Sequence, residues 1–251
     1  MLTHLNPAER RLYVILCANF VILGISMTII GATVPQIIAG FHWTYVETGL
    51  VLAGGSLGYL LSTFASGPLL RRVPERVLVA VGLGITALAL CFIVRSPLFW
   101  VNCILNILIG IGQGFSEVVT NTLVIRLEKK GESRLMNLMH AFYCVGAVVG
   151  PVVVGLLAWL GIGFVTVLLI AGVIQVAVAV LLTLQTYPQL GGGNVPVEPA
   201  MPGELEATVV DANGGGLPAS AGVTRLIRSP LLLVAALTLF FYVGVELTMS
   251  N

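Results

Sequence analysis

The sequence consists mostly of long uncharged apolar runs separated by short polar segments. A helix that crosses the ~30 Å hydrocarbon layer of a membrane needs about 20 mostly apolar residues. Seven runs reach that length, and we expect a transmembrane helix in each of them: Leu12–Pro35, Tyr45–Leu70, Val77–Val94, Leu98–Ile125, Leu135–Leu160, Ile162–Leu184 and Pro230–Asn251. The pattern therefore predicts an all-α polytopic membrane protein.

The segment between the sixth and seventh runs has a different composition. Residues 187–228 are rich in proline and glycine and show no apolar periodicity, which is typical of a flexible linker. The predicted domains are a six-helix bundle over 1–186, the linker over 187–228, and one helix over 229–251. This is the layout of a two-bundle transporter interrupted early in its second bundle, so we expect the chain to be a fragment whose partner is the missing C-terminal bundle.

Composition and charge exclude several classes of function. The chain is 57% hydrophobic and 9% charged, against about 25% charged residues in a soluble domain. A net charge of +1 with scattered basic residues excludes a nucleic-acid partner. The four cysteines have irregular spacing, and no nucleophile, base and orienting group occur together, so we expect no metal, no cofactor and no enzyme.

The basic residues predict the orientation in the membrane. Lysine and arginine stay on the cytoplasmic side of a membrane. With a cytoplasmic N-terminus, every basic residue except Arg95 lies on the inner side, and Trp43, Trp100 and Trp159 lie at the outer boundary. We therefore expect a plasma (inner) membrane protein whose N-terminus and 187–228 linker are cytoplasmic.

The number of polar side chains in a span predicts whether it faces lipid or a water-filled cavity, because hydrocarbon offers no hydrogen bonds. The third and sixth runs are nearly free of polar residues and should face lipid. The fourth run carries five polar residues on one helical face, which predicts that this face lines a cavity. They are Asn102, Asn106, Gln113, Glu117 and Asn121.

Small residues predict close helix packing at three places. The second run has Gly54, Gly58, Ser62 and Ser66 at four-residue spacing. The fifth run has Gly146 and Gly150 before Pro151, where we favour packing over bending. The glycines of 110–114 lie inside a long apolar helix, so we interpret them as packing and not as a nucleotide-binding loop.

Glu117 is the strongest functional candidate. A carboxylate inside a membrane span costs at least ~2.5 kcal/mol, so it is neutralised, paired or placed in a wet cavity. If the fourth and fifth helices form an antiparallel hairpin, His140 lies near the depth of Glu117, and the two could pair; alternatively a backbone carbonyl or water satisfies His140. Glu246, four residues after Tyr242, is the corresponding acid of the seventh run.

Three segments resemble one transporter group. Residues 110–122 (GIGQGFSEVVTNT), 136–151 (MNLMHAFYCVGAVVGP) and 242–251 (YVGVELTMSN) are similar to the fucose:proton symporter and glucose/galactose transporter group of the major facilitator superfamily. The resemblance implies a six-helix N-terminal bundle and places Glu117 and Asn121 in a sugar and proton pathway. The residues assigned to the substrate and proton pathway are Asn106, Gln113, Glu117, Asn121, His140, Tyr143 and Glu246.

The sequence also departs from the superfamily pattern. In the loop between the second and third helices, Arg71 stands where aspartate is usual and Pro74 where glycine is usual, so the usual ion pair of this loop is not expected. The leading hypothesis is a secondary transporter for a sugar or related small polar solute, working by alternating access and coupled to protons or sodium ions. A drug or metabolite exporter of the same superfamily and a non-transporting receptor or scaffold are the alternatives.

Overall fold

The computed structural model describes residues 5–129, 133–185 and 187, and all regular structure in these residues is helical. The helices are α1 (Pro7–Phe41), α2 (Tyr45–Leu70), α3 (Glu75–Phe92), α4 (Phe99–Leu127), α5 (Arg134–Trp159) and α6 (Phe164–Leu184). All six are long and apolar enough to cross a membrane. The first six expected spans are thus confirmed, whereas the seventh span, Glu246 and the linker beyond Tyr187 lie outside the described residues.

Capping residues set helix ends that hydropathy alone misplaces. The side chain of Asn6 accepts a hydrogen bond from the Glu9 amide, and the Glu9 carboxylate accepts one from the Asn6 amide, each at 2.9 Å. This capping box starts α1 at Pro7, before the apolar run begins. The helix also continues past Pro35 to Phe41, because a membrane helix tolerates the one backbone hydrogen bond that a proline removes.

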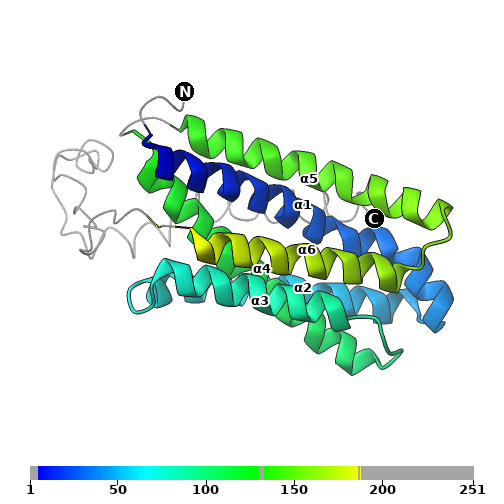
Figure 1. Cartoon of the computed structure of the whole chain (residues 1–251). Coiled ribbons are helices and arrows are strands. Elements are labelled where there is room, and N and C mark those ends of the chain that lie inside the picture. Colours follow the sequence, from blue (N-terminus) through cyan, green and yellow to red (C-terminus); the bar gives the residue numbers. More distant parts are fainter. Residues whose placement is uncertain (1–4, 130–132, 186, 188–251) are drawn as a thin grey trace, which may run out of the picture. The chain divides into compact units, whose positions relative to one another are not determined.

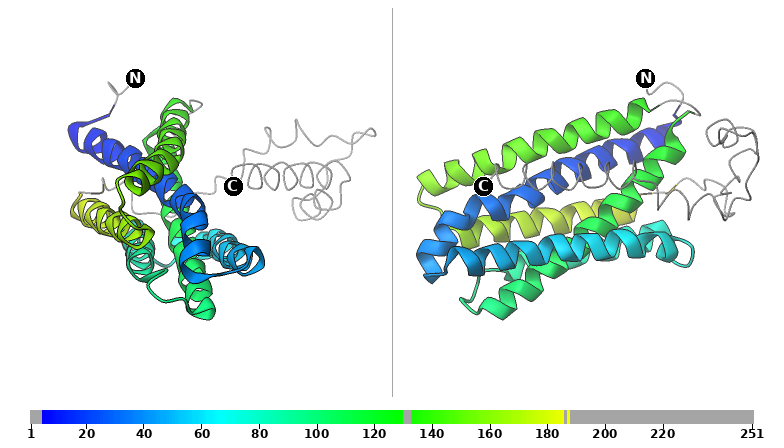
Figure 2. Two further views of the ribbon diagram at one scale, coloured as in Figure 1. Left: turned by 90° about the vertical axis from the view of Figure 1, so that its right-hand side faces the viewer. Right: turned by 180° about the vertical axis from the view of Figure 1, so that it is seen from behind.

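Most of the close helix pairs join helices that are not neighbours in sequence, and α3 with α4 is the exception (Figure 1). The main pairs are α2 with α4, α1 with α5, and α3 with α6, and α3 also packs against α4 (Figure 2). If α1, α2 and α3 are exchanged with α4, α5 and α6 respectively, the α2–α4 pair becomes the α1–α5 pair and the reverse. The α3–α6 pair is converted into itself. The bundle therefore has the arrangement expected of two three-helix repeats.

Glycines bring α2 and α4 into backbone contact. A Cβ atom on Gly58 would collide with the carbonyl oxygen of Ile107, and one on Gly110 would collide with that of Gly55. Farther along the same interface, Gly114 lies directly against the side chain of Ser62. The predicted small-residue contact of the second run is confirmed, and we call this interface the α2–α4 seam.

The α1–α5 pair is built in the same way. Gly146 of α5 faces the carbonyl group of Val21, and Gly24 of α1 faces that of Tyr143. Pro151 lies inside an α5 helix that continues to Trp159. The glycines of the fifth run thus serve packing, as the sequence indicates.

The surface of α3 and α6 is almost entirely apolar. Beyond Arg76 at its first turn, the exposed residues of α3 are aliphatic or aromatic, and Thr166 is the exposed polar residue of α6. Gly172 of α6 lies against the Ala87 carbonyl of α3, so the two helices pack closely. Such a surface suits contact with lipid tails, which stays a prediction for these two helices.

Candidate functional site

Glu117 is held by a tyrosine of the neighbouring helix. The hydroxyl group of Tyr59 on α2 donates a hydrogen bond of 2.7 Å to Oε2 of Glu117 on α4, and both side chains are partly buried. The backbone of Tyr59 lies in the α2–α4 seam, against Gly110. Sequence reasoning missed Tyr59, although it directly follows Gly58, a residue of the predicted small-residue contact.

A second polar contact reaches the same part of α4 from α1. Asn19 is completely buried, and its amide nitrogen donates to Ser116 Oγ at 3.1 Å and to Thr120 Oγ1 at 3.2 Å. These two residues flank Glu117 along α4. Asn19 was not predicted either, because a single asparagine in a span whose other polar residues are mostly serine and threonine gives no spacing signal.

Three buried polar atoms near Glu117 lack a partner among the described residues. They are the donor Nε2 of Gln113 and the acceptors Oδ1 of Asn19 and Oδ1 of Asn121. Leaving a buried polar group without a hydrogen bond costs about 1–3 kcal/mol. Such atoms are therefore positions where a polar solute or ordered water would gain hydrogen bonds. Gln113 and Asn121, both predicted site residues, thus remain candidates on geometric grounds.

The other end of the polar face has a structural role. Asn106 donates a hydrogen bond of 2.6 Å to the carbonyl oxygen of Val51 across the seam. Asn102 accepts from the Val94 amide at 2.7 Å and donates to the Ser96 carbonyl at 2.8 Å, which fixes the connection between α3 and α4. The expectation that all five residues line one cavity is corrected here, because Asn102 and Asn106 use their amide groups to hold backbone.

His140 and Tyr143 lie on α5 and pack against α1. Their rings contact Phe20 edge to face, with centroids 5.3 Å and 6.4 Å away. His140 is exposed, and the one ion pair of the described residues does not involve it. The hypothesised pairing of His140 with Glu117 is wrong, because α5 packs along α1.

The end of the bundle where α1 begins holds the one ion pair of the described residues. Glu75 of α3 and Arg126 of α4 form an ion pair of 2.5 Å, each side chain about a quarter exposed. Arg76 donates to the Thr183 carbonyl of α6. An ion pair therefore lies next to the loop between α2 and α3, and its acid is Glu75. Nearby, burial raises the pKa of Tyr187 to about 12.

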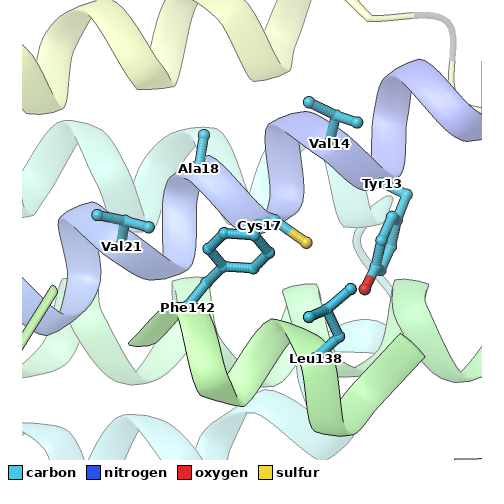
Figure 3. A pocket seen from close by; sticks show the side chains of 7 residues that line it. All are labelled: Tyr13, Val14, Cys17, Ala18, Val21, Leu138 and Phe142. Atoms are coloured by element: carbon cyan, nitrogen blue, oxygen red, sulfur yellow. The ribbon is translucent and has the colours of Figure 1, made fainter. Parts of the chain in front are cut away.

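A separate groove of about 410 Å³ lies between α1 and α5 (Figure 3). Figure 3 shows Leu138 and Phe142 of α5 pointing toward Cys17 and Tyr13 of α1. The lining is almost entirely apolar, and it includes none of the predicted site residues. This groove offers a polar solute nothing to bind, in contrast to the surroundings of Glu117.

Comparison with known proteins places this geometry in a family. The sequence model of the Major Facilitator Superfamily matches residues 16–250. The chain is 27% identical over 96% of its length to Bypass of stop codon protein 6 of Saccharomyces cerevisiae, and spans 49% of that protein. It is 22% and 23% identical to Sodium-dependent glucose transporter 1 of Danio rerio and of Homo sapiens, over 57% and 59% of its length.

The chain spans about half the length of the yeast relative, and 24% and 28% of the two glucose transporters. The family match and the two transporters point to a transporter and not to an enzyme, as the sequence predicts. Six apolar helices and the family match identify an integral membrane protein.

Proposed function

The chain belongs to the Major Facilitator Superfamily, and on that premise we propose that its protein transports a sugar or a related small polar solute by alternating access, coupled to protons through Glu117. The observation that carries the proposal is the setting of Glu117. It is an intramembrane acid with a neutral hydrogen-bond partner, and intramembrane acids mark ion and proton pathways.

The substrate class follows from the unpaired polar atoms. A sugar hydroxyl both donates and accepts hydrogen bonds. Gln113 and Asn121, one turn on either side of Glu117 on α4, offer a donor and an acceptor, and Asn19 on α1 offers a second acceptor. The names of two relatives and the resemblance to the fucose:proton symporter group support a sugar. In this proposal the second wall of the site comes from a second bundle.

The proposal has two testable forms, in which the coupling ion is either a proton or sodium. Glu117 interacts with a neutral phenol, and such a carboxyl group can bind and release a proton without breaking an ion pair. Sodium is the alternative ion, since two relatives are named sodium-dependent. A drug or metabolite exporter of the same superfamily is the alternative function.

We also propose that the end of the bundle with Arg10, Arg11, Arg71 and Arg72 faces the cytoplasm, together with the 187–228 linker. A cysteine placed at Gly203 should then resist labelling by a membrane-impermeant maleimide in intact cells and react after permeabilisation. Equal labelling before and after permeabilisation would show that the linker lies outside the cell, and the proposed orientation would then be wrong.

The transport proposal is tested with the protein in its full natural length, reconstituted into liposomes and given labelled D-glucose. A pH gradient alone should drive accumulation, and a sodium gradient alone should not. Glu117→Gln keeps the size and hydrogen-bonding capacity of the side chain but cannot ionise. This variant should exchange glucose at equal pH on both sides and lose proton-driven accumulation.

The matched control is Glu47→Gln, which removes a partly exposed acid of the capping box at the first turn of α2 and should leave accumulation unchanged. If Glu117→Gln still concentrates glucose under a pH gradient, Glu117 is not the coupling residue. If only a sodium gradient drives accumulation, the coupling ion is sodium and not the proton. No saturable glucose movement under any gradient would overturn glucose as the solute and favour the exporter or scaffold alternative.

A further inference from the structure

We propose that Tyr59 is the positioning residue that sets the pH range in which Glu117 takes up and releases its proton. This inference rests on the proposed coupling role of Glu117 and deepens it. It follows from the direct hydrogen bond of 2.7 Å between the Tyr59 hydroxyl and Glu117 Oε2. Within the described residues, this hydroxyl is the one hydrogen-bond donor to the Glu117 side chain.

The α2–α4 seam fixes the Tyr59 backbone. Gly55 lies one turn before Tyr59, and Gly58 lies directly before it. Both glycines are in backbone contact with α4. One turn later, Ser62 Oγ donates to the Tyr59 carbonyl at 2.9 Å and lies against Gly114. A tyrosine side chain has two rotatable angles, so a fixed backbone leaves its hydroxyl little freedom. Tyr59 is therefore positioned before Glu117 ionises, and the hydrogen bond needs no rearrangement of the helices.

No described basic group competes with Tyr59 for Glu117. On α5, His140 and Tyr143 both pack against Phe20 of α1. On α1, Cys17 interacts with Tyr13, whose hydroxyl donates to the Leu135 carbonyl.

The remaining helices add no competing charge. Within α3 and α4, Glu75 and Arg126 neutralise each other, and Arg76 reaches toward α6. The α6 segment Phe164–Leu184 contains no titratable residue. Within the described helices, Tyr59 is therefore the group that stabilises a charge on Glu117.

The direction of the effect follows from the chemistry of the pair. A hydrogen bond donated to a carboxylate stabilises the ionised form relative to the protonated form. The hydrogen bond from Tyr59 therefore favours the ionised form of the Glu117 side chain. Removing the hydroxyl should make Glu117 hold its proton to higher pH. Because Tyr59 acts through Glu117, the readout must report the proton on Glu117 itself.

Infrared difference spectroscopy of the purified protein in its full natural length, titrated with acid and base alone, supplies that readout without a transported solute. The C=O stretch of protonated Glu117 is assigned as the band that Glu117→Gln removes. In Tyr59→Phe, the pH midpoint of this band should rise by about one unit, a tenfold change in proton affinity. The matched control Tyr45→Phe removes an exposed hydroxyl from the same helix and should leave the midpoint in place.

A second variant keeps the test decisive if Tyr59→Phe fails to fold. Incorporating 3-fluorotyrosine at position 59 preserves the ring and strengthens the hydroxyl as a donor, so the midpoint should move to lower pH. A midpoint that stays within a tenth of a unit in both variants would overturn the role of Tyr59. Failure of Glu117→Gln to abolish proton-driven accumulation would instead overturn the coupling proposal, whatever the infrared midpoints show.

Discussion

Two glutamates of the bundle are held by different kinds of partner. Glu75, at the end where α1 begins, is 2.5 Å from the guanidinium group of Arg126. Glu117, inside α4, is 2.7 Å from the neutral hydroxyl of Tyr59. An ion pair loses its attraction when the acid is protonated, whereas a phenol can hydrogen-bond a carboxyl group in either protonation state by exchanging donor and acceptor. The first arrangement suits a fixed link between helices, and the second suits a proton-binding site.

Giving Glu117 the kind of partner that Glu75 has should produce the largest effect. In Tyr59→Arg, a guanidinium group would stabilise the ionised carboxylate far more strongly than the phenol does. We expect proton-driven accumulation of labelled solute to fall at least tenfold (roughly 1.4 kcal/mol or more), with uptake measured in proteoliposomes under a pH gradient. Tyr45→Arg, at the exposed start of α2, is the control and should accumulate normally. Full accumulation by Tyr59→Arg would show that the neutrality of the partner does not matter.

The seam that supports Tyr59 gives the next largest effect, on stability. Gly110→Ala would place a methyl group against the Gly55 carbonyl, and forcing such a contact typically costs ~1–3 kcal/mol. Gly84→Ala on α3 is the matched control, because a Cβ atom there meets nothing within 4 Å. It should be neutral or stabilise the helix by up to ~1 kcal/mol. Unfolding in detergent, followed by circular dichroism, measures both, and equal midpoints would contradict the close contact.

Breaking the ion pair should have the smallest effect. Arg126→Gln leaves Glu75 about a quarter exposed to solvent, and such pairs contribute ~0–1 kcal/mol. We expect a slight loss of stability that shrinks at high salt, with the pH dependence of uptake unchanged. A changed pH profile would mean that the ion pair and Glu117 are coupled, and the contrast between the two glutamates would then be wrong.

Hydropathy predicted the six described spans because a membrane helix needs a long apolar run whatever its neighbours are. Glycine spacing predicted which surfaces approach closely, since it is a local property of one helix. The partners were harder to predict. Tyr59 and Glu117 are 58 residues apart, and Asn19 and Ser116 are 97 apart, so only the helix pairing brings them together. The assumption that consecutive helices pack together led to the wrong partner for Glu117.

The cross-bundle pairing also determines the order of assembly during synthesis. The partner of α1 is α5, which begins about ninety residues after α1 ends. At a synthesis rate of roughly 5–20 residues per second, α1 waits on the order of 5–20 s before its partner exists. A transmembrane helix satisfies its own backbone hydrogen bonds and survives that interval alone. Until α5 arrives, Gly24 and the Val21 carbonyl lack the contact that they make in the finished bundle, so α1 is an independent span that α5 later fastens in place.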